Sequence, residues 1–243
     1  EMVVPLLDTD DQALQRAALE VIGRHQGWAD QTRGLLEKWL AEKTIDTKRS
    51  SVIRGFLLSQ QSDVAIQKLV AERLGDDSLG LSARRLLIDV VGRSSIETLP
   101  AGWREMLVAS LGHDDLTIRE GAVRALASRR LVDPSLERLI DDSRQPAPLR
   151  VAALEGLAER TLADGRFGFL LKRLDADLPS LSRLAAARVA AAVRLSKSQQ
   201  IQVAMRIKTA GPLVLPVLLR SCRDLSDSRV ASAVLDSLES DKA

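Results

Sequence analysis

The sequence predicts an all-α protein, a right-handed α-solenoid of about six to eight stacked helical pairs. Three observations predict this fold. An arginine-led apolar stripe recurs about every 34 residues, a second amphipathic segment precedes each stripe, and the 45% of apolar residues contrast with only 2% aromatics. Leu, Ala, Val and Ile must therefore build the core, and such a core suits closely packed helices better than sheets.

The repeat is clearest in "IREGAVRALASRR" (118–130) and "LRVAALEGLAER" (149–160). In each, an anchor arginine is followed at positions +2, +3, +4 and +7 by small or apolar residues, which form one stripe on a helix. The anchor positions are Gln15, Arg49, Arg84, Arg119, Arg150 and Arg183, with spacings of 34, 35, 35, 31 and 33 residues. No helical pair of this size buries its own apolar face, so we expect neighbouring pairs to stack.

Amphipathic segments precede the stripes, most clearly at 28–43, 62–74, 102–111 and 164–174. Turns rich in Asp, Ser, Gly and Pro separate the two helices of a pair. We expect regular repeats over 1–195. The period then falters, so residues 196–243 should form three less regular helices of the same solenoid. The chain begins in the apolar stretch "MVVPLL", typical of the end of a helix, and we expect a piece of a longer protein.

This two-helix unit, with Arg near the start of the second helix and small then larger apolar residues after it, resembles a HEAT repeat. The short variety found in phycobilin-lyase-type proteins is the most similar. Asp11, Asp46 and Asp115 precede their anchors by three or four residues, as the turn of that family often has, whereas Pro146 and Pro179 take this place in later copies. The resemblance implies a stack whose second helices line a concave face.

The stretch "AGPLVLP" (210–216) is similar to the end of helical-repeat blocks in large envelope-associated proteins of planctomycete-type bacteria. In those proteins a dehydrogenase-like propeller and a c-type cytochrome module can flank the repeats. This similarity implies a connecting module in the cell envelope or periplasm. Without it, we expect a cytoplasmic protein.

Charge is unevenly distributed along the chain. Residues 1–120 carry 15 Lys or Arg against 19 Asp or Glu, and residues 121–243 carry 20 against 14. A basic half could attract an acidic partner, although the excess is mostly Arg and could instead reflect genomic base composition. Cys222 is the only cysteine, which excludes an intrachain disulfide. The longest apolar run, 209–219, is too short to span a bilayer.

Two rows of arginines are candidate functional groups. The anchors Arg49, Arg84, Arg119, Arg150 and Arg183 are interpreted as a structural ladder that bonds turn carbonyls and acidic residues of the neighbouring repeat. The alternative for this row is a charged binding stripe. A second row follows the apolar stripes and comprises Arg24, Arg93, Arg129, Arg130, Arg160 and Arg194. The helix dipole favours cations at these helix ends; alternatively, the row forms a basic stripe for an acidic protein or a nucleic-acid backbone.

Catalytic and metal-binding patterns are not recognisable. His25 and His113 are the only histidines and share no predicted helix, so we expect no zinc or di-iron site and no cofactor. GxSxG, GxGxxG and P-loop strings do not occur. Paired carboxylates such as Asp76 and Asp77 are interpreted as solvated turn residues. Trp28, Trp39 and Trp103 are expected to cover apolar seams, and Phe167 and Phe169 to lie in the core.

We therefore expect a non-catalytic scaffold or protein-interaction module, not an enzyme, that binds a partner protein or a flanking domain on its concave face. The alternative is a nucleic-acid-binding protein similar to the HEAT-like alkylpurine DNA glycosylases. Such an enzyme needs aromatic and acidic residues around an exposed base, and this chain is poor in aromatics. A chromophore-lyase subunit is a third option based on repeat similarity alone. The sequence leaves the oligomeric state open.

Overall fold

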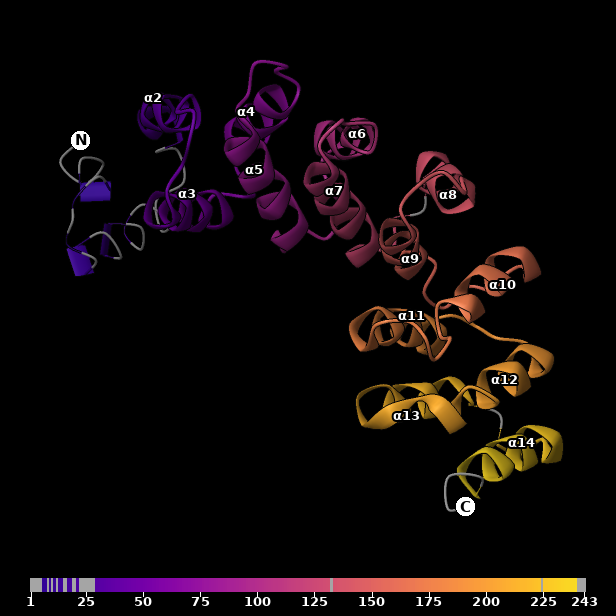
Figure 1. Cartoon of the computed structure of the whole chain (residues 1–243). Coiled ribbons are helices and arrows are strands. Elements are labelled where there is room, and N and C mark those ends of the chain that lie inside the picture. Colours follow the sequence, from indigo (N-terminus) through magenta and orange to yellow (C-terminus); the bar gives the residue numbers. More distant parts are fainter. Residues whose placement is uncertain are drawn as a thin grey trace. The chain divides into compact units, whose positions relative to one another are not determined.

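A computed structural model describes residues 6–7, 9, 11, 13–14, 17–18, 21, 29–131, 133–223 and 225–239. Over these residues the chain is all-α, as predicted (Figure 1). The chain divides into two compact units, residues 1–126 and 127–243. Gln15, the first expected anchor, lies outside the described residues. The number of repeats, their handedness and the boundary at residue 195 stay predictions.

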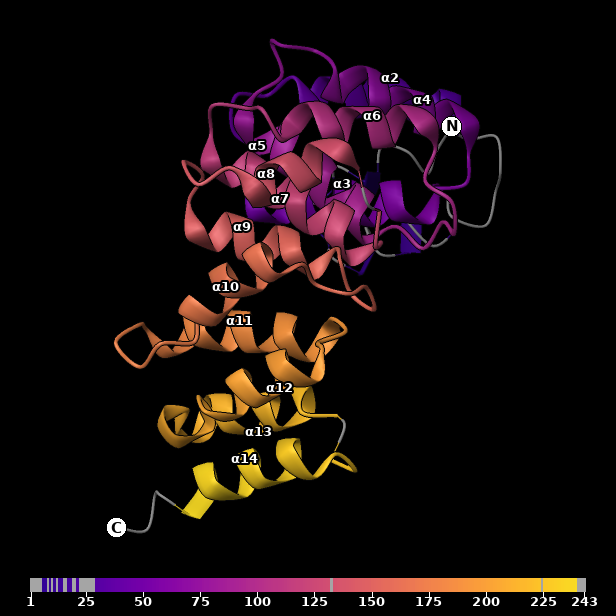
Figure 2. The same ribbon diagram turned by 90° about the vertical axis from the view of Figure 1, so that its right-hand side faces the viewer.

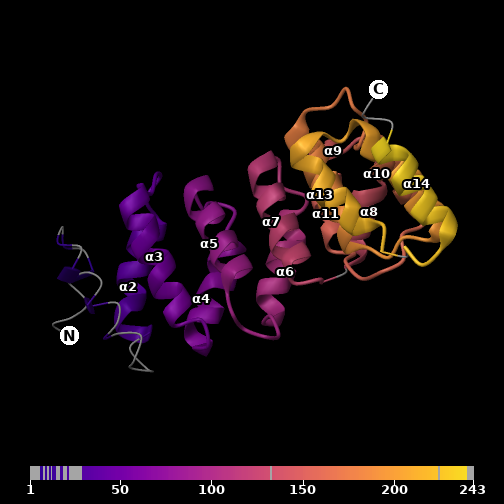
Figure 3. The same ribbon diagram turned by 90° about the horizontal axis from the view of Figure 1, so that it is seen from below.

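Helices of the first unit alternate between two layers. The first layer holds α2 (Ala29–Leu40), α4 (Val64–Leu74) and α6 (Ala101–Ser110), and the second holds α3 (Thr47–Ser59), α5 (Leu81–Arg93) and α7 (Leu116–Ser128), whose last two residues belong to the next unit. In the first layer α4 packs against both α2 and α6, and in the second layer α3 packs against α5. Figure 3 shows α3, α5 and α7 following one another. Helices therefore pack mainly against the equivalent helices of neighbouring pairs.

The apolar stripes form the contact between neighbouring second helices. A Cβ added at Gly121, in the stripe of α7, would lie 3.1 Å from Cγ2 of Ile88 in the stripe of α5. In the first layer Trp103 is fully buried, and its Nε1 donates to the carbonyl of Gln67 on α4 at 2.8 Å. Trp39 is also buried. Both tryptophans belong to first helices, where the sequence places them on apolar seams.

Acidic residues before the anchors cap the second helices. The side chain of Asp46 accepts a hydrogen bond from the amide of Arg49 at 2.8 Å. Asp115 accepts from two amides in the first turn of α7 at 2.8 and 3.2 Å, and a further hydrogen bond from a threonine hydroxyl holds its pKa at about 2. Pro146 and Pro179 occupy the N-cap positions of later second helices without a side-chain cap. The fixed φ of proline is compatible with this position.

The helices of the second unit also alternate between two layers (Figure 1), and Figure 2 shows them following one another in chain order. Its helices are α8 (Pro134–Asp141), α9 (Ala147–Glu155), α10 (Asp164–Lys172), α11 (Ser180–Ala192), α12 (Lys197–Ala204), the 3-10 turn η2 (Ile207–Thr209), α13 (Gly211–Ser221) and α14 (Ser228–Glu239). Helix α11 packs against α9 on one side and α13 on the other, and α12 packs against α10 and α14. The three helices expected after residue 195 are present, and the inserted turn η2 together with Pro216 inside α13 accounts for the irregular period there.

In this unit the first helices of the pairs, α8, α10 and α12, are joined by polar contacts as well. Arg166 on α10 forms a bidentate pair with Asp141 on α8 at 2.7 and 2.9 Å and a further contact with Glu137 at 3.2 Å. These acids raise the pKa of Arg166, with the hydrogen bonds to Asp141 as the main cause. The side-chain amide of Gln199 on α12 donates to Asp164, at the start of α10, at 3.0 Å. In this unit α10 and α12 are therefore each joined to the preceding first helix.

Candidate functional site

The anchor arginines lie beside the C-terminal ends of the first helices. Arg84 is buried and donates to the carbonyls of Leu74 at 2.6 Å and Asp76 at 2.7 Å. Arg150 donates through Nε to the carbonyl of Ile140 at 2.7 Å. The last carbonyls of a helix lack donors within the helix, and a guanidinium supplies several at once. These anchors therefore complete the end of the first helix.

Most of the observed partners lie within the anchor's own pair, whereas the expectation placed them in the neighbouring repeat. Arg84, Arg150 and Arg183 bond the end of the first helix of their own pair, because its carbonyls are the acceptors nearest to the start of the second helix. Arg183 also bonds the carbonyl of Thr209 in the following pair. Arg49 contacts Glu42 at 2.5 Å, again within its own pair, and Arg119 is half-buried on α7.

Two members of the second arginine row come together. The amide of Arg194 donates to the carbonyl of Arg160 at 2.8 Å, and Thr161 forms an isolated parallel bridge with Arg194. Both arginine side chains are exposed. The turns that follow α9 and α11 are therefore joined through their backbones, and the two guanidiniums extend from this joint.

Other members of the second row have separate surroundings. Arg24 lies outside the described residues. Arg93 ends α5 and pairs with Asp89, four residues earlier on the same helix, at 2.7 Å. Arg129 is partly buried, which lowers its pKa, and Arg130 is exposed in a left-handed conformation with φ of 52°. The structure thus brings only Arg160 and Arg194 together among the members that it describes.

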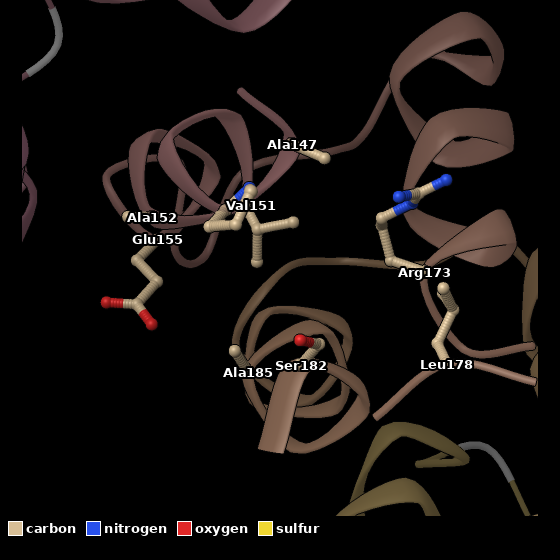
Figure 4. A pocket seen from close by; sticks show the side chains of 9 residues that line it. Ala147, Val151, Ala152, Glu155, Arg173, Leu178, Ser182 and Ala185 are labelled. Atoms are coloured by element: carbon tan, nitrogen blue, oxygen red, sulfur yellow. The ribbon is translucent and has the colours of Figure 1, made fainter. Parts of the chain in front are cut away.

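A narrow apolar slot opens between α9 and α11 (Figure 4). Its volume is about 150 Å³. Nine residues line it: Ala147, Pro148, Val151, Ala152, Glu155, Arg173, Leu178, Ser182 and Ala185. Val151 points from α9 toward α11, while Glu155 and Arg173 lie on opposite sides of the slot (Figure 4). Its middle is therefore apolar and its two sides carry opposite charges.

Phe169 supports the Arg173 side of this slot. The guanidinium of Arg150 lies 3.9 Å from the centroid of the Phe169 ring, and that of Arg173 lies 5.7 Å from it. Both distances are typical of cation–π contacts. The expectation that Phe167 and Phe169 both lie in the core is therefore half correct, since Phe167 is buried whereas Phe169 is half-exposed and contacts two arginines.

A second, wider pocket lies between α11 and α13. Its volume is about 550 Å³, and it is lined by Arg188, Ala191, Ala192, Val217, Arg220 and Arg223. Arg223 donates to the carbonyl of Ala191. Arg188 and Arg220 are exposed, and neither has an ion-pair partner within the part of the chain that the structure describes. Asp224, which follows Arg223 in the sequence, lies outside that part.

Sequence reasoning missed Arg188 and Arg220, although a signal for them exists. The fifth residue after each anchor is always charged and its sign alternates: Glu20, Arg54, Asp89, Arg124, Glu155 and Arg188. Within this column, Arg54 on α3 and Asp89 on α5 form an ion pair at 2.7 Å. Arg220 follows Arg188 by 32 residues and puts a second arginine where the alternation predicts an acid.

No helix in the described ranges is long and apolar enough to cross a membrane. Among the same residues, no group of three or more His, Cys, Asp or Glu side chains is arranged to hold a metal ion. No protein-family model matches the chain, and no curated protein sequence matches it. The function must therefore be argued from the surface of the molecule.

Proposed function

We propose that this chain is a non-catalytic protein-interaction module, a HEAT-like right-handed α-solenoid that binds a partner protein or a flanking domain through its second helices. The binding surface is the solvent-facing side of α9, α11 and α13, called here the second-helix face. In a solenoid of this hand the second helices line the concave side, which offers a large surface for distributed contacts.

The observation that carries this proposal is the composition of the second-helix face. Leu181 on α11 is 74% exposed and Leu213 on α13 is 49% exposed. Pro148 on α9 and Pro216 on α13 are exposed as well. Exposed apolar residues that recur on neighbouring helices, next to a slot and a pocket, mark interaction surfaces more often than scattered single ones do.

The first unit also exposes leucines at the starts of its second helices, Leu81 on α5 and Leu116 on α7, and in addition it pairs charges between these helices. There Arg54 and Asp89 join α3 to α5, and Arg85 on α5 contacts Asp115 before α7 at 3.1 Å. These charges satisfy one another across neighbouring helices. In the second unit Arg188 and Arg220 have no such partner among the described residues, and Leu181 is exposed on α11, seven residues before Arg188. A partner would therefore gain most by binding to the second unit.

Affinity capture from a lysate of the source organism tests the proposal. The immobilised full chain is compared with a variant carrying Leu181→Asp and Leu213→Asp, which places charges on the second-helix face. Met205→Asp is the matched control, because Met205 is 63% exposed but lies at the end of α12, a first helix. Quantitative mass spectrometry should show a common set of proteins on wild type and control that falls severalfold on the double variant.

An identical set of captured proteins on all three forms would contradict the proposal. Substitution of exposed leucines leaves the core intact, so thermal unfolding of the three forms should agree within a few degrees. A loss of capture with unchanged unfolding therefore assigns the effect to the surface and not to the fold.

A further inference from the structure

Arg188 and Arg220 line one pocket from two neighbouring helices. Each guanidinium carries a full positive charge at any physiological pH. Like charges that share a site repel each other, and a negative group between them relieves that repulsion. Arg223, whose guanidinium bonds the carbonyl of Ala191, adds a third positive charge to the same pocket. Among the described residues that line the pocket none is acidic, so the pocket attracts an anionic group.

We infer that this pocket binds carboxylates of an acidic peptide segment in a partner protein, and that the neighbouring slot takes one apolar side chain of the same segment. The inference rests on the proposed function and specifies the chemistry of the ligand. Arginine is suited to this task, because its planar fork donates two parallel hydrogen bonds to a carboxylate.

The slot has the size of a single side chain. A dry apolar cavity of about 150 Å³ accommodates benzene, whereas small-molecule sites usually measure about 300–1,000 Å³. The slot measures about 150 Å³, and Val151, Leu178 and Ala185 contribute apolar atoms to it. A leucine, isoleucine or phenylalanine side chain fits this space, and a whole cofactor does not.

Slot and pocket open on the same side of α11. Ala185 lines the slot, whereas Arg188 and Ala192 line the pocket, and these three residues are spaced three and four apart, so they share one face of the helix. Helix axes lie about 8–10 Å apart, and an extended chain advances about 3.3 Å per residue. A peptide that crosses α11 therefore places its apolar residue about three positions from its acidic residues.

An acidic peptide fits these observations better than a nucleic acid. Glu155 lines the slot, so its carboxylate would repel a phosphate backbone that ran over both sites. The lining of the slot is mostly apolar, which suits an aliphatic side chain. Backbone recognition of nucleic acids also depends on many phosphate contacts along a track, whereas the cationic residues here converge on one pocket.

Selection from a random dodecapeptide phage library on the immobilised full chain tests the inference. Enriched peptides should carry two or more Asp or Glu residues about three positions from a Leu, Ile or Phe. Fluorescein-labelled copies of the enriched peptides are then titrated against variants. The double variant Arg188→Glu/Arg220→Glu should bind these peptides at least about tenfold more weakly, because its introduced carboxylates repel the acidic residues of the peptide. Ala185→Trp, which fills the slot, should remove the preference for an apolar residue.

The matched control is Arg138→Glu/Lys172→Glu, which makes the same charge change at exposed residues of the first helices α8 and α10. The peptide affinity of this control should stay within about twofold of that of wild type, since salt screens the field of charges that lie far from the pocket. All substituted residues are exposed or half-exposed, and thermal melts of the variants confirm that each is folded.

Enrichment of basic or uncharged peptides, or no enrichment at all, would overturn the inference. So would affinity that survives Arg188→Glu/Arg220→Glu or depends on Arg160 and Arg194 instead. A short DNA duplex that displaces the peptide with a steep dependence on salt would reassign the pocket to phosphate. In each of these cases, if capture from the lysate still falls for the Leu181→Asp/Leu213→Asp variant, the proposed interaction function stands although the proposed ligand is wrong. If capture does not fall for that variant either, the proposed function is refuted as well.

Discussion

Trp103→Ala should lower the free energy of unfolding of the first unit by about 3–5 kcal/mol, the usual cost of removing a large buried aromatic side chain. Trp103 is completely buried on α6, and its indole N–H bonds the carbonyl of Gln67 on α4 at 2.8 Å. The substitution would leave a cavity between two first helices and delete the hydrogen bond that joins them. Urea unfolding followed by far-UV circular dichroism measures the loss.

Trp103→Phe separates the two contributions. Phenylalanine keeps most of the buried ring but lacks the N–H donor, so we expect a loss smaller than that of alanine by about 1–3 kcal/mol. A loss below about 1 kcal/mol for Trp103→Ala would contradict the packing described here, because it would mean that α4 and α6 do not depend on each other.

Arg84→Met should cost about 2–6 kcal/mol, because a buried carbonyl that loses its donor costs about 1–3 kcal/mol and Arg84 serves two. Arg84 bonds the carbonyls of Leu74 and Asp76 at the end of α4, and the methionine keeps much of the side-chain volume. The same urea experiment applies. A binding role for this arginine would instead predict a stable variant.

Arg85→Met is the matched control for this prediction. Arg85 is the next residue of α5, but its side chain is 48% exposed and pairs with Asp115 at the surface. Exposed ion pairs contribute about 0–1 kcal/mol, so the control should remain close to wild type. Equal losses for the two variants would contradict the role of Arg84 at the end of the first helix.

The spacing of apolar residues predicted the helices well. The apolar residues that pack against neighbouring helices recur every three or four positions, which is the period of an α-helix. The segment 164–174 was expected and α10 spans Asp164–Lys172; the segment 62–74 was expected and α4 spans Val64–Leu74. The position of the anchors near turns also followed from their offset. Their partners did not, because spacing along one helix cannot show which helix end lies nearest to a side chain.

The candidate binding site was not predictable to the same degree. Whether an arginine is paired depends on the residue that the neighbouring helix places opposite it, as the contrast between Arg54 and Arg188 shows. Arg220 lies in the stretch where the period falters, so its equivalence to Arg188 emerges only when α11 and α13 are seen together. Phe169 illustrates the same limit, since its ring contacts Arg150 of α9, and spacing along α10 does not show this contact.

The partners of the anchor arginines and the candidate binding site were hard to predict for the same physical reason. A helical pair in a repeat protein has little independent stability, and both its core and its surface pockets are completed by the next pair. Ala186, Ala187, Val189 and Ala190 of α11 are buried although they are small, and α11 packs against both α9 and α13. The pocket lined by Arg188 and Arg220 exists only where α13 lies against α11.

Amide hydrogen exchange in a chain that ends at residue 195 tests this dependence most directly. The truncation removes α12, α13 and α14, which exposes the side of α11 that packs against α13. The amides of α11 should exchange at least about tenfold faster than in the full chain, while those of α4 and α5 in the first unit should keep their protection. Unchanged protection of α11 would show that the pair α10/α11 is stable by itself, and that result would contradict the account.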